Sequence, residues 1–258
     1  MPYSDLLLDR DGAVAVLTLN RPTKRNSLSL GLMEEVLTAL GQVAGDPEIG
    51  ALIVRGAGPA FCAGHDLGEM TGQDVPTYRK IFDTCTRIMD AFQALPQPVI
   101  AQVHGIATAA GCQLVATCDL AVAEEGARFA TPGVKIGLFC STPMVPVARA
   151  VGRKKALEML LTGDYIDAHE ARAFGLVNRV VSAGALADET LALARKVAAA
   201  SPLVLGLGKR AFYAQMDLPQ PQAYAYAKEV MSLNAMAADA QEGMCAFLEK
   251  RPAVWKGR

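Results

Sequence analysis

The sequence has no long apolar run, no excess of basic residues and no CxxC motif. No stretch reaches the roughly 18 apolar residues that a transmembrane helix requires, so we expect no membrane insertion. Lysine and arginine total 25 against 26 acidic residues, and no basic stripe is interleaved with aromatics, which argues against a nucleic-acid partner. The six cysteines are scattered, so we expect no metal site and free thiols in a reducing compartment.

The first eleven residues also lack the features of a targeting segment. They carry acids early and have no cationic start followed by a long apolar stretch. They also lack the arginine-rich pattern of a transit peptide. We therefore expect a cytoplasmic protein.

What the chain does contain is the pattern of a globular α/β protein. Hydrophobic residues make up 52% and charged residues 20% of its 258 residues, and a chain of this length can bury a core without disulfides. Short apolar strands alternate with helical segments in the first half, which predicts an α/β fold. Asp11-Gly12 separates two short strands, of which the second covers 13–19. Further strands are expected at 51–55, 98–103 and 120–123, and helices at 29–43, 76–94 and 109–118, the first of them capped by Ser29.

The last third of the chain is predicted to be mainly helical. Strand patterns become sparse after residue 149, and helices are expected at 154–161, 168–173, 185–200, 202–216 and 220–250. We therefore expect a core over residues 1–200 and a C-terminal helical region over 201–258 that serves assembly rather than chemistry.

Two turns rich in glycine and alanine carry the first indication of chemistry. They are FCAGHD at 61–66 and HGIATAAGC at 104–112, and each follows a predicted strand and leads into helical sequence. Small residues let a ligand approach the backbone closely, and the first turn of a helix offers N–H groups without internal partners. Two such N–H groups directed at one point form an oxyanion hole. Either turn alone is more typical of an ordinary tight turn than of an oxyanion hole.

Together with the sequence around them, these turns resemble the crotonase (enoyl-CoA hydratase/isomerase) family. Residues 98–119, PVIAQVHGIATAAGCQLVATCD, resemble the family signature, and FCAGHDL resembles its first oxyanion-loop motif. Residues 156–181, ALEMLLTGDYIDAHEARAFGLVNRVV, are similar to the stretch that follows, and EGMCAFLEKR is similar to the C-terminal helix. AAGCQLVATCD and GLFCSTP look closest to the branch typified by enoyl-CoA hydratase domain-containing protein 3.

The resemblance implies a spiral of ββα units with a helical C-terminal region that forms a homotrimer, often a dimer of trimers. It also implies an acyl-CoA thioester as the ligand, with no cofactor apart from the coenzyme A of the substrate and no metal ion. The thioester oxygen would lie between the backbone N–H groups of His65 and Ala110, where Ala110 replaces the usual glycine. Such fixed donors would stabilise an enolate more than the neutral thioester.

Residues matched to the family's coenzyme A contacts fall in three parts of the chain. The loop 23–25 would lie beside the ribose and phosphates, the backbone near Ala63 and Leu67 would line the adenine pocket, and the C-terminal helix would contribute, in many relatives across a subunit boundary. Basic residues suit phosphate contact, although solvated surface charge is an equal alternative. The candidates are Thr23, Lys24, Arg25, Ala63, Asp66, Leu67, Phe247 and Lys250, with Asp66 more typical of a capping acid.

The chain departs from the family pattern at both catalytic glutamates. Matched position by position, Gln113 and Gly133 stand where hydratases of the family carry these acids. An amide can orient a water but cannot accept its proton, and general acid–base help is typically worth ~10²–10⁴ in rate. Cys140 could replace a base if its thiolate were favoured, although a small apolar core residue is the simpler interpretation. The ring of His65 is likewise more typical of a structural residue.

Three functions are consistent with the sequence. The first is an enoyl-CoA hydratase/isomerase-type enzyme that uses the oxyanion hole with an unidentified proton carrier. The second is a non-catalytic acyl-CoA binding or regulatory protein that keeps the fold. The third is a structural trimer without affinity for coenzyme A. The sequence offers Met70, Tyr78 and Phe82 as pocket-wall candidates but does not specify the acyl chain.

Overall fold

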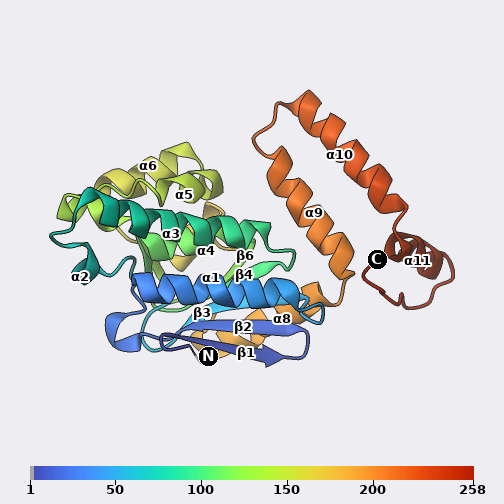
Figure 1. The fold of residues 1–258 in the computed structure, drawn as a ribbon, viewed down its shortest axis with the longest axis horizontal. Coiled ribbons are helices and arrows are strands. Elements are labelled where there is room, and N and C mark those ends of the chain that lie inside the picture. The colour runs from blue at the N-terminus through green and yellow to red at the C-terminus, as the bar shows by residue number, and fades with distance from the viewer. Residues whose placement is uncertain (1–2) are drawn as a thin grey trace.

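A six-stranded sheet forms the centre of the computed structural model, which describes residues 3–258 (Figure 1). In sheet order its strands are β1 (Leu6–Asp11), β2 (Val14–Leu19), β3 (Ala51–Gly56), β4 (Val99–Val103), β6 (Leu120–Glu124) and β9 (Arg179–Val181). β1 is antiparallel to β2, and all other neighbours are parallel. Parallel strands covered on both faces are apolar throughout, and β2 to β4 are buried at most positions.

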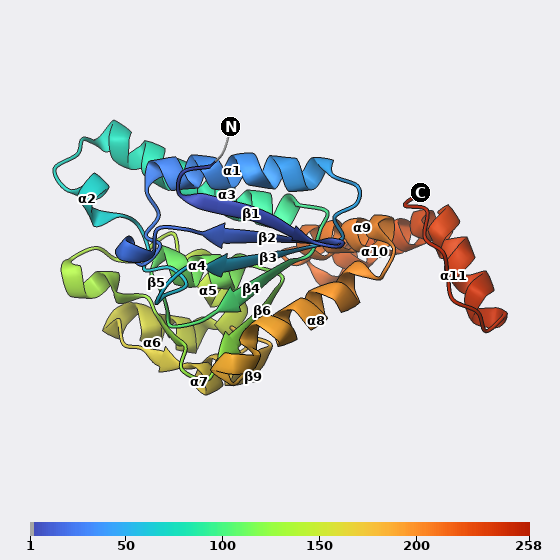
Figure 2. The ribbon, with the colours of Figure 1, turned by 90° about the horizontal axis from the view of Figure 1, so that it is seen from below.

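Helices cover both faces of this sheet (Figure 2). One face carries α1 (Leu30–Gly45), α3 (Val75–Ala94) and α4 (Ala110–Thr117), which contribute to the larger apolar cluster. The other face carries α8 (Leu186–Ala198), whose Leu186 and Leu193 belong to a second cluster with Ile53 and Ile100. α1 begins as its capping signal predicts, because Ser29 Oγ accepts a hydrogen bond from the Leu32 N–H at 3.2 Å.

A smaller, three-stranded sheet lies beside the first. Its order is β5 (Ile106–Thr108), β7 (Arg128–Ala130) and β8 (Ile166–Asp167). The sequence pattern did not predict β5, β7, β8 or β9, because two or three residues are too few to show a period. Short helices complete the core: α2 (Leu67–Met70), α5 (Met144–Val151), α6 (Arg153–Thr162), α7 (Ala168–Ala173), and the 3₁₀ helices η1 (Pro22–Lys24), η2 (Pro132–Ile136) and η3 (Ala183–Ala185).

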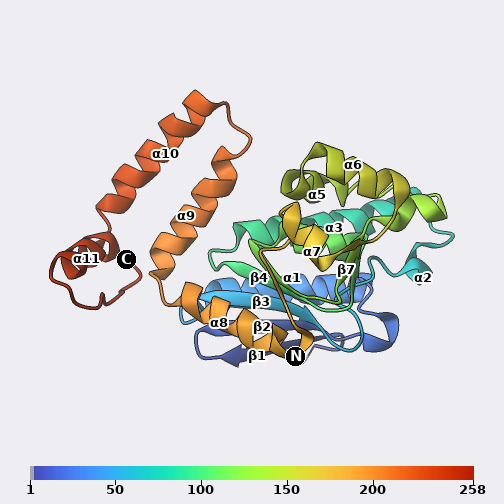
Figure 3. The same cartoon turned by 180° about the vertical axis from the view of Figure 1, so that it is seen from behind.

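The chain leaves the core after Ser201 as an arm of helices, shown in Figure 3, formed by α9 (Pro202–Gln215), α10 (Gln220–Ala235) and α11 (Ala238–Leu248). The prediction of one helix over 220–250 is wrong, because the chain breaks at Ala237, whose backbone is extended. The break places Asp239 in a buried position, where it accepts hydrogen bonds from Ser201 Oγ at 2.6 Å and the Lys256 N–H at 2.7 Å.

α9 is fastened to the core through a buried ion pair. Lys209 Nζ lies 2.7 Å from Asp119 Oδ2, and it also donates to the carbonyl oxygens of Phe92 (2.7 Å) and Gln97 (3.0 Å). The Tyr213 hydroxyl donates to Asp119 Oδ1 at 2.7 Å. These bonds fix the angle at which the arm leaves the core.

Two expectations concern the chain as a whole. The division at residue 200 falls next to the start of α9, and the role of the region beyond it in assembly stays a prediction. Within residues 3–258, no single helix is both long and apolar enough to cross a membrane. The segments 183–198 and 202–215 together reach the required length and apolar composition, but the chain bends by 101° between them.

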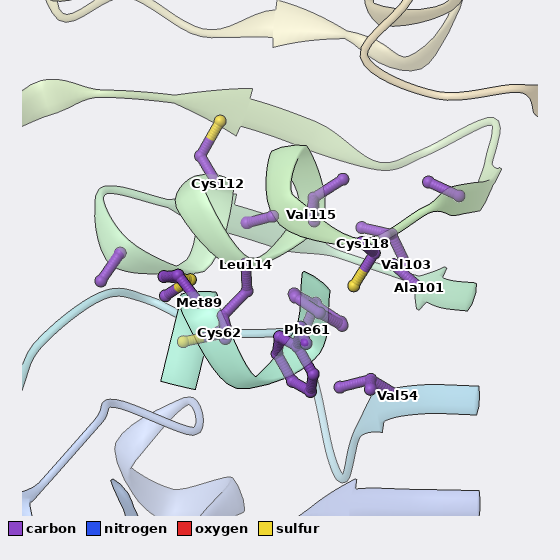
Figure 4. Close-up of a cluster of buried hydrophobic side chains, with 14 of the residues drawn as sticks. Val54, Phe61, Cys62, Met89, Ala101, Val103, Cys112, Leu114, Val115 and Cys118 are labelled. Carbon is purple, nitrogen blue, oxygen red and sulfur yellow. The ribbon is translucent and has the colours of Figure 1, made fainter. Parts of the chain in front are cut away.

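The cysteines are free thiols, all buried except Cys245. Figure 4 shows Cys62, Cys112 and Cys118 among apolar side chains such as Leu114. Burial raises the pKa of Cys62 and of Cys112 to about 12. These side chains therefore serve as small apolar residues of the core.

Candidate active site

The two glycine- and alanine-rich turns lie side by side. The Cys62 N–H donates to the Ile106 carbonyl at 3.2 Å, and the Thr108 N–H donates to the Cys62 carbonyl at 3.0 Å. This pairing is parallel, so the two segments continue in the same direction. They bring His65 and Ala110, far apart in sequence, to the wall of one cavity.

Two backbone N–H groups at this place are free. Among residues 3–258, neither the His65 nor the Ala110 N–H donates to another protein atom. On either side of His65, the Leu28 N–H donates to the Gly64 carbonyl at 2.7 Å, and the Asp66 N–H donates to the Leu28 carbonyl at 2.9 Å. Ala110 is the first residue of α4, where N–H groups lack intrahelical partners and form the positive end of the helix dipole.

These N–H groups border a cavity of about 600 Å³ with mainly apolar walls. Of the residues that the sequence singled out, Ala63, Leu67, Met70, Phe82, Gly133 and Cys140 also line it. Tyr78 does not, because its hydroxyl donates to the Met70 carbonyl at 2.6 Å. The remaining lining residues are Ser27, Ala109, Pro132, Lys135, Ile136, Leu138, Phe139, Ser141, Thr142 and Pro143.

Gly133 is held where no side chain fits. Its N–H donates to Cys140 Sγ at 3.3 Å, and its carbonyl accepts from the Leu138 N–H at 2.9 Å. A Cβ atom at this position would lie 2.0 Å from the Leu138 carbonyl oxygen and 2.8 Å from Cys140 Sγ. A glutamate here would therefore require the backbone of the 133–140 turn to move.

Cys140 contributes a neutral thiol to the cavity wall. It is 6% exposed, and burial raises its pKa although the hydrogen bond from Gly133 lowers it. A nucleophile or base requires the thiolate, which this environment disfavours. The structure thus favours the interpretation of Cys140 as a small apolar residue.

The imidazole of His65 is neutral as well. Its ring lies edge-on to Phe82, with ring centroids 5.5 Å apart, and burial lowers its pKa to about 4. Its Nε2 atom is buried without a hydrogen-bond partner. In the part of the chain that the structure describes, no group of three or more His, Cys, Asp or Glu residues could hold a metal ion.

Gln113 lies one turn along α4 from Ala110 and is 3% exposed. It is not among the residues that line the cavity, but its Oε1 atom is buried and has no partner within residues 3–258. A buried acceptor without a hydrogen-bond partner lowers stability, so such an atom usually accepts a hydrogen bond from a water or a ligand. Gln113 can therefore orient a polar group close to the cavity.

The loop that carries Thr23, Lys24 and Arg25 is exposed but firmly held. Asn26 closes it: its Nδ2 donates to the carbonyl oxygens of Ala57 (2.8 Å) and Ala60 (2.7 Å), and its Oδ1 accepts from the Arg21 N–H. The Arg25 carbonyl accepts from the Ala63 N–H at 3.0 Å, which places the loop beside the cavity. Sequence reasoning missed Asn26, although asparagine in a turn is the residue that most readily adopts its positive φ of 55°.

Asp66 braces the first turn rather than lining the cavity. Its Oδ1 accepts from the Gly68 N–H at 3.1 Å and caps α2, and its Oδ2 lies 3.0 Å from Arg21 Nη2. Burial raises its pKa, but the hydrogen bonds from Arg21 and Gly68 outweigh this and hold it below its usual value. This geometry agrees with the capping role expected for Asp66.

Phe247 and Lys250 are not brought to the cavity of their own chain. Figure 2 shows α11 at the opposite end of the molecule from α2, whose Leu67 and Met70 line the cavity. Phe247 is 82% exposed. Within one chain, these two residues therefore lie apart from the other candidates.

Replacing Ala109 with glycine should raise the melting temperature. Ala109 has φ 50° and ψ −117°, a conformation that costs a non-glycine residue about 1–3 kcal/mol. Glycine removes this strain but loses about 0.5–1 kcal/mol in chain entropy, so we expect a net gain of about 1 kcal/mol, or roughly 2–4 °C for a chain of this size.

Differential scanning calorimetry measures this shift. Ala107→Gly is the control, because Ala107 is a buried alanine two residues earlier that has no positive φ, whereas Ala109 is partly buried. The control should lose stability. A loss of similar size in Ala109→Gly would show that Ala109 is not strained.

Comparison with known proteins agrees with the geometry. The family model described as enoyl-CoA hydratase/isomerase matches residues 9–258. The chain is 48% identical to "Enoyl-CoA hydratase domain-containing protein 3, mitochondrial" of Danio rerio, over 96% of this chain and 86% of that protein. It is 35% identical to the 2,3-dehydroadipyl-CoA hydratase of Escherichia coli (strain K12), over 99% of this chain and 100% of that protein.

Solved structures share the fold. An enoyl-CoA hydratase of Mycobacterium smegmatis has a TM-score of 0.95 at 50% identity, over 98% of this chain and 99% of that one. Human enoyl Coenzyme A hydratase domain-containing protein 3 has a TM-score of 0.95 at 44% identity, over 98% and 100% of the two chains. These similarities confirm the crotonase-like α/β fold and the branch that the motifs indicated.

The comparisons bear less directly on location. The name of the Danio rerio relative places that protein in mitochondria, and the cytoplasmic expectation for this chain stays a prediction. Fold, sequence motifs and relatives agree on the family: the chain belongs to the enoyl-CoA hydratase/isomerase, or crotonase, family.

Proposed function

We propose that this chain is an acyl-CoA-processing enzyme of the enoyl-CoA hydratase/isomerase type. The observation that carries the proposal is the pair of free N–H groups, from His65 and Ala110, on the wall of one apolar cavity. Two donors fixed in this way bind the thioester oxygen and stabilise the negative charge that it gains when an enolate forms. The acyl group lies in the cavity.

The proton carrier for this chemistry does not come from a cavity carboxylate. Hydration of an enoyl thioester adds water at the β-carbon and a proton at the α-carbon, yet no aspartate or glutamate lines the cavity. Gln113 and Gly133 occupy the two positions of the family acids, His65 is neutral, and the Cys140 thiol is protonated. We infer that Gln113 orients a water, and that a hydratase reaction here is slow.

Coenzyme A binding is assigned to the candidates around the mouth of the cavity. Lys24 and Arg25 suit its phosphates and Thr23 its ribose, and the backbone near Ala63 and Leu67 suits its adenine. Phe247 and Lys250 complete the site only from a second copy. The exposed apolar side chains of the arm support such a homotrimer, or a dimer of trimers: Phe212, Tyr224, Met231, Leu233, Met236, Phe247 and Leu248.

The alternative function is non-catalytic binding of acyl-CoA, in a regulatory role. The absence of any aspartate or glutamate from the lining residues favours it, because binding needs the two N–H donors but no base. Calorimetric titration with coenzyme A and hexanoyl-CoA, together with a turnover assay on crotonoyl-CoA, separates the possibilities. Binding with slow turnover supports the enzyme, binding without turnover the alternative, and no binding would leave only a structural trimer.

A single substitution, Gln113→Glu, should raise crotonoyl-CoA hydration. It returns a carboxylate to one family position without the steric conflict that Gly133→Glu would create at the Leu138 carbonyl. A general base is worth ~10²–10⁴ in rate, and we expect an increase of at least about tenfold because the second acid is still missing. Steady-state kinetics at saturating crotonoyl-CoA measures it.

Gln97→Glu is the matched control for this variant. Gln97 is also a buried amide with a partner-free Oε1 atom in the described chain, but it lies just before β4 and not on α4 with the proposed donor Ala110. It should leave turnover unchanged. If Gln113→Glu binds crotonoyl-CoA with wild-type affinity but hydrates it no faster, the missing carboxylate at position 113 does not limit the reaction.

A further inference from the structure

The cavity offers almost nothing to a charged acyl group. Its walls are built from alanine, proline, methionine and larger apolar side chains, with Phe82 from α3 and Phe139 from the segment 132–143 among the largest. Its hydroxyl groups belong to Ser27, Ser141 and Thr142. None of the lining residues is acidic, and the imidazole in the wall is neutral.

The permanent cation among the lining residues is already paired. Lys135 Nζ lies 2.7 Å from Asp164 Oδ1, and the Lys135 ammonium holds the pKa of the Asp164 carboxyl below its usual value. Both side chains are at least half exposed, so the pair lies at the solvent side of the cavity. With Asp164 in place, Lys135 presents little net charge to an acyl group.

We propose that this cavity selects acyl-CoA thioesters whose acyl group is an uncharged hydrocarbon, and that the Lys135–Asp164 pair excludes acyl groups that end in a carboxylate. The proposal rests on the proposed function, since it places the acyl group in this cavity. A carboxylate brought among apolar walls loses its hydration without gaining a partner, whereas a methyl terminus loses nothing.

The size of the cavity favours acyl groups longer than butanoyl. Its volume of about 600 Å³ lies in the range of sites that enclose drug-sized ligands. Burial of each added methylene improves affinity by about three- to fourfold, as long as the chain still fits. Affinity should therefore rise from butanoyl-CoA through hexanoyl-CoA to octanoyl-CoA.

Calorimetric titration of the full-length protein tests the proposal with a matched pair of ligands. Hexanoyl-CoA and adipoyl-CoA share a six-carbon chain and differ in the terminal carboxylate. We expect adipoyl-CoA to bind on the order of a hundredfold more weakly. Equal or tighter binding of adipoyl-CoA, or equal affinity for butanoyl-CoA and octanoyl-CoA, would overturn the proposal.

Free coenzyme A separates this failure from failure of the proposed function. If the protein binds coenzyme A but does not prefer hexanoyl-CoA over adipoyl-CoA, the selectivity proposal alone is wrong. If it binds neither coenzyme A nor any acyl-CoA, the proposed function fails and the selectivity proposal fails with it.

Asp164→Asn tests the role of the ion pair. Asp164 is 73% exposed and does not line the cavity, so the variant should fold and bind hexanoyl-CoA as before. Without Asp164, the Lys135 ammonium is free to pair with the terminal carboxylate, so the affinity for adipoyl-CoA should rise by roughly two- to fivefold, which corresponds to the strength of an exposed ion pair. Asp217→Asn is the control, because Asp217 is similarly exposed, is paired with Arg149 and lies outside the cavity. No change in Asp164→Asn, or an equal change in the control, would overturn the assignment to Lys135–Asp164.

Discussion

Replacing Ala110 with proline should lower the rate of the thioester reaction by about 10²–10³, the usual loss when one oxyanion donor is removed. Proline has no N–H, so the substitution deletes the proposed donor directly. Ala110 is the first residue of α4, a position where proline is favoured because its missing N–H has no intrahelical partner. The helix itself should therefore tolerate the change.

The residue before the proline requires a second substitution. Proline restricts its predecessor through contact between its Cδ and the preceding Cβ, and Ala109 already has an unusual backbone conformation. The informative variant is therefore Ala109→Gly/Ala110→Pro, compared with Ala109→Gly alone. Both variants should retain wild-type affinity for coenzyme A, and their melting temperatures should be similar to each other, so that a loss of rate can be attributed to the N–H group.

Steady-state kinetics on crotonoyl-CoA provides the measurement, in the Gln113→Glu background if wild-type turnover is too slow to follow. Ala109→Gly/Ala110→Gly serves as a further control, since it keeps both N–H groups. A folded double variant with proline that binds coenzyme A and keeps its rate within about threefold of the control would remove Ala110 from the oxyanion hole, because a true donor contributes far more.

The parts of the fold that the sequence predicted are those with local causes. The Asp11-Gly12 pair between two apolar runs indicated the turn from β1 to β2, and Gly12 has the positive φ of 58° that such a turn uses. Ser29 marked the start of α1 through its own side chain. Each signal is contained within a few residues, so no knowledge of the rest of the chain was needed.

The features that the sequence did not predict depend on how the chain folds back on itself. Gly133 was read as a lost glutamate, but the fold shows that the Leu138 carbonyl occupies the space of any side chain there. The pairing of Lys135 with Asp164 joins residues 29 positions apart, and no spacing rule links them. The resemblance assigned Phe247 to the site, in many relatives across a subunit boundary; α11 lies away from the cavity of its own chain, and supply by a second copy stays a prediction.

Replacing Lys209 with methionine should destabilise the protein by about 3–5 kcal/mol, the cost of leaving one charge of a buried pair without its partner. Lys209 and Asp119 have side chains that are 7% and 16% exposed. Burial lowers the pKa of Lys209, while the attraction to Asp119 acts in the opposite direction. Methionine keeps the length of the side chain but leaves the Asp119 carboxylate with hydrogen bonds from Val99 and Tyr213 alone.

Urea unfolding followed by circular dichroism, at one fixed protein concentration, measures this loss. Lys80→Met is the matched control, because Lys80 is 62% exposed and lies 3.8 Å from Glu34, and exposed pairs contribute about 0–1 kcal/mol. The double variant Asp119→Asn/Lys209→Met removes both charges and should recover part of the loss, which a double-mutant cycle quantifies. Since Lys209 also binds the Phe92 and Gln97 carbonyls, recovery should be incomplete. If Lys209→Met costs no more than Lys80→Met, the pair does not hold α9 against the core, and the other contacts of α9 with α3 must set the angle of the arm.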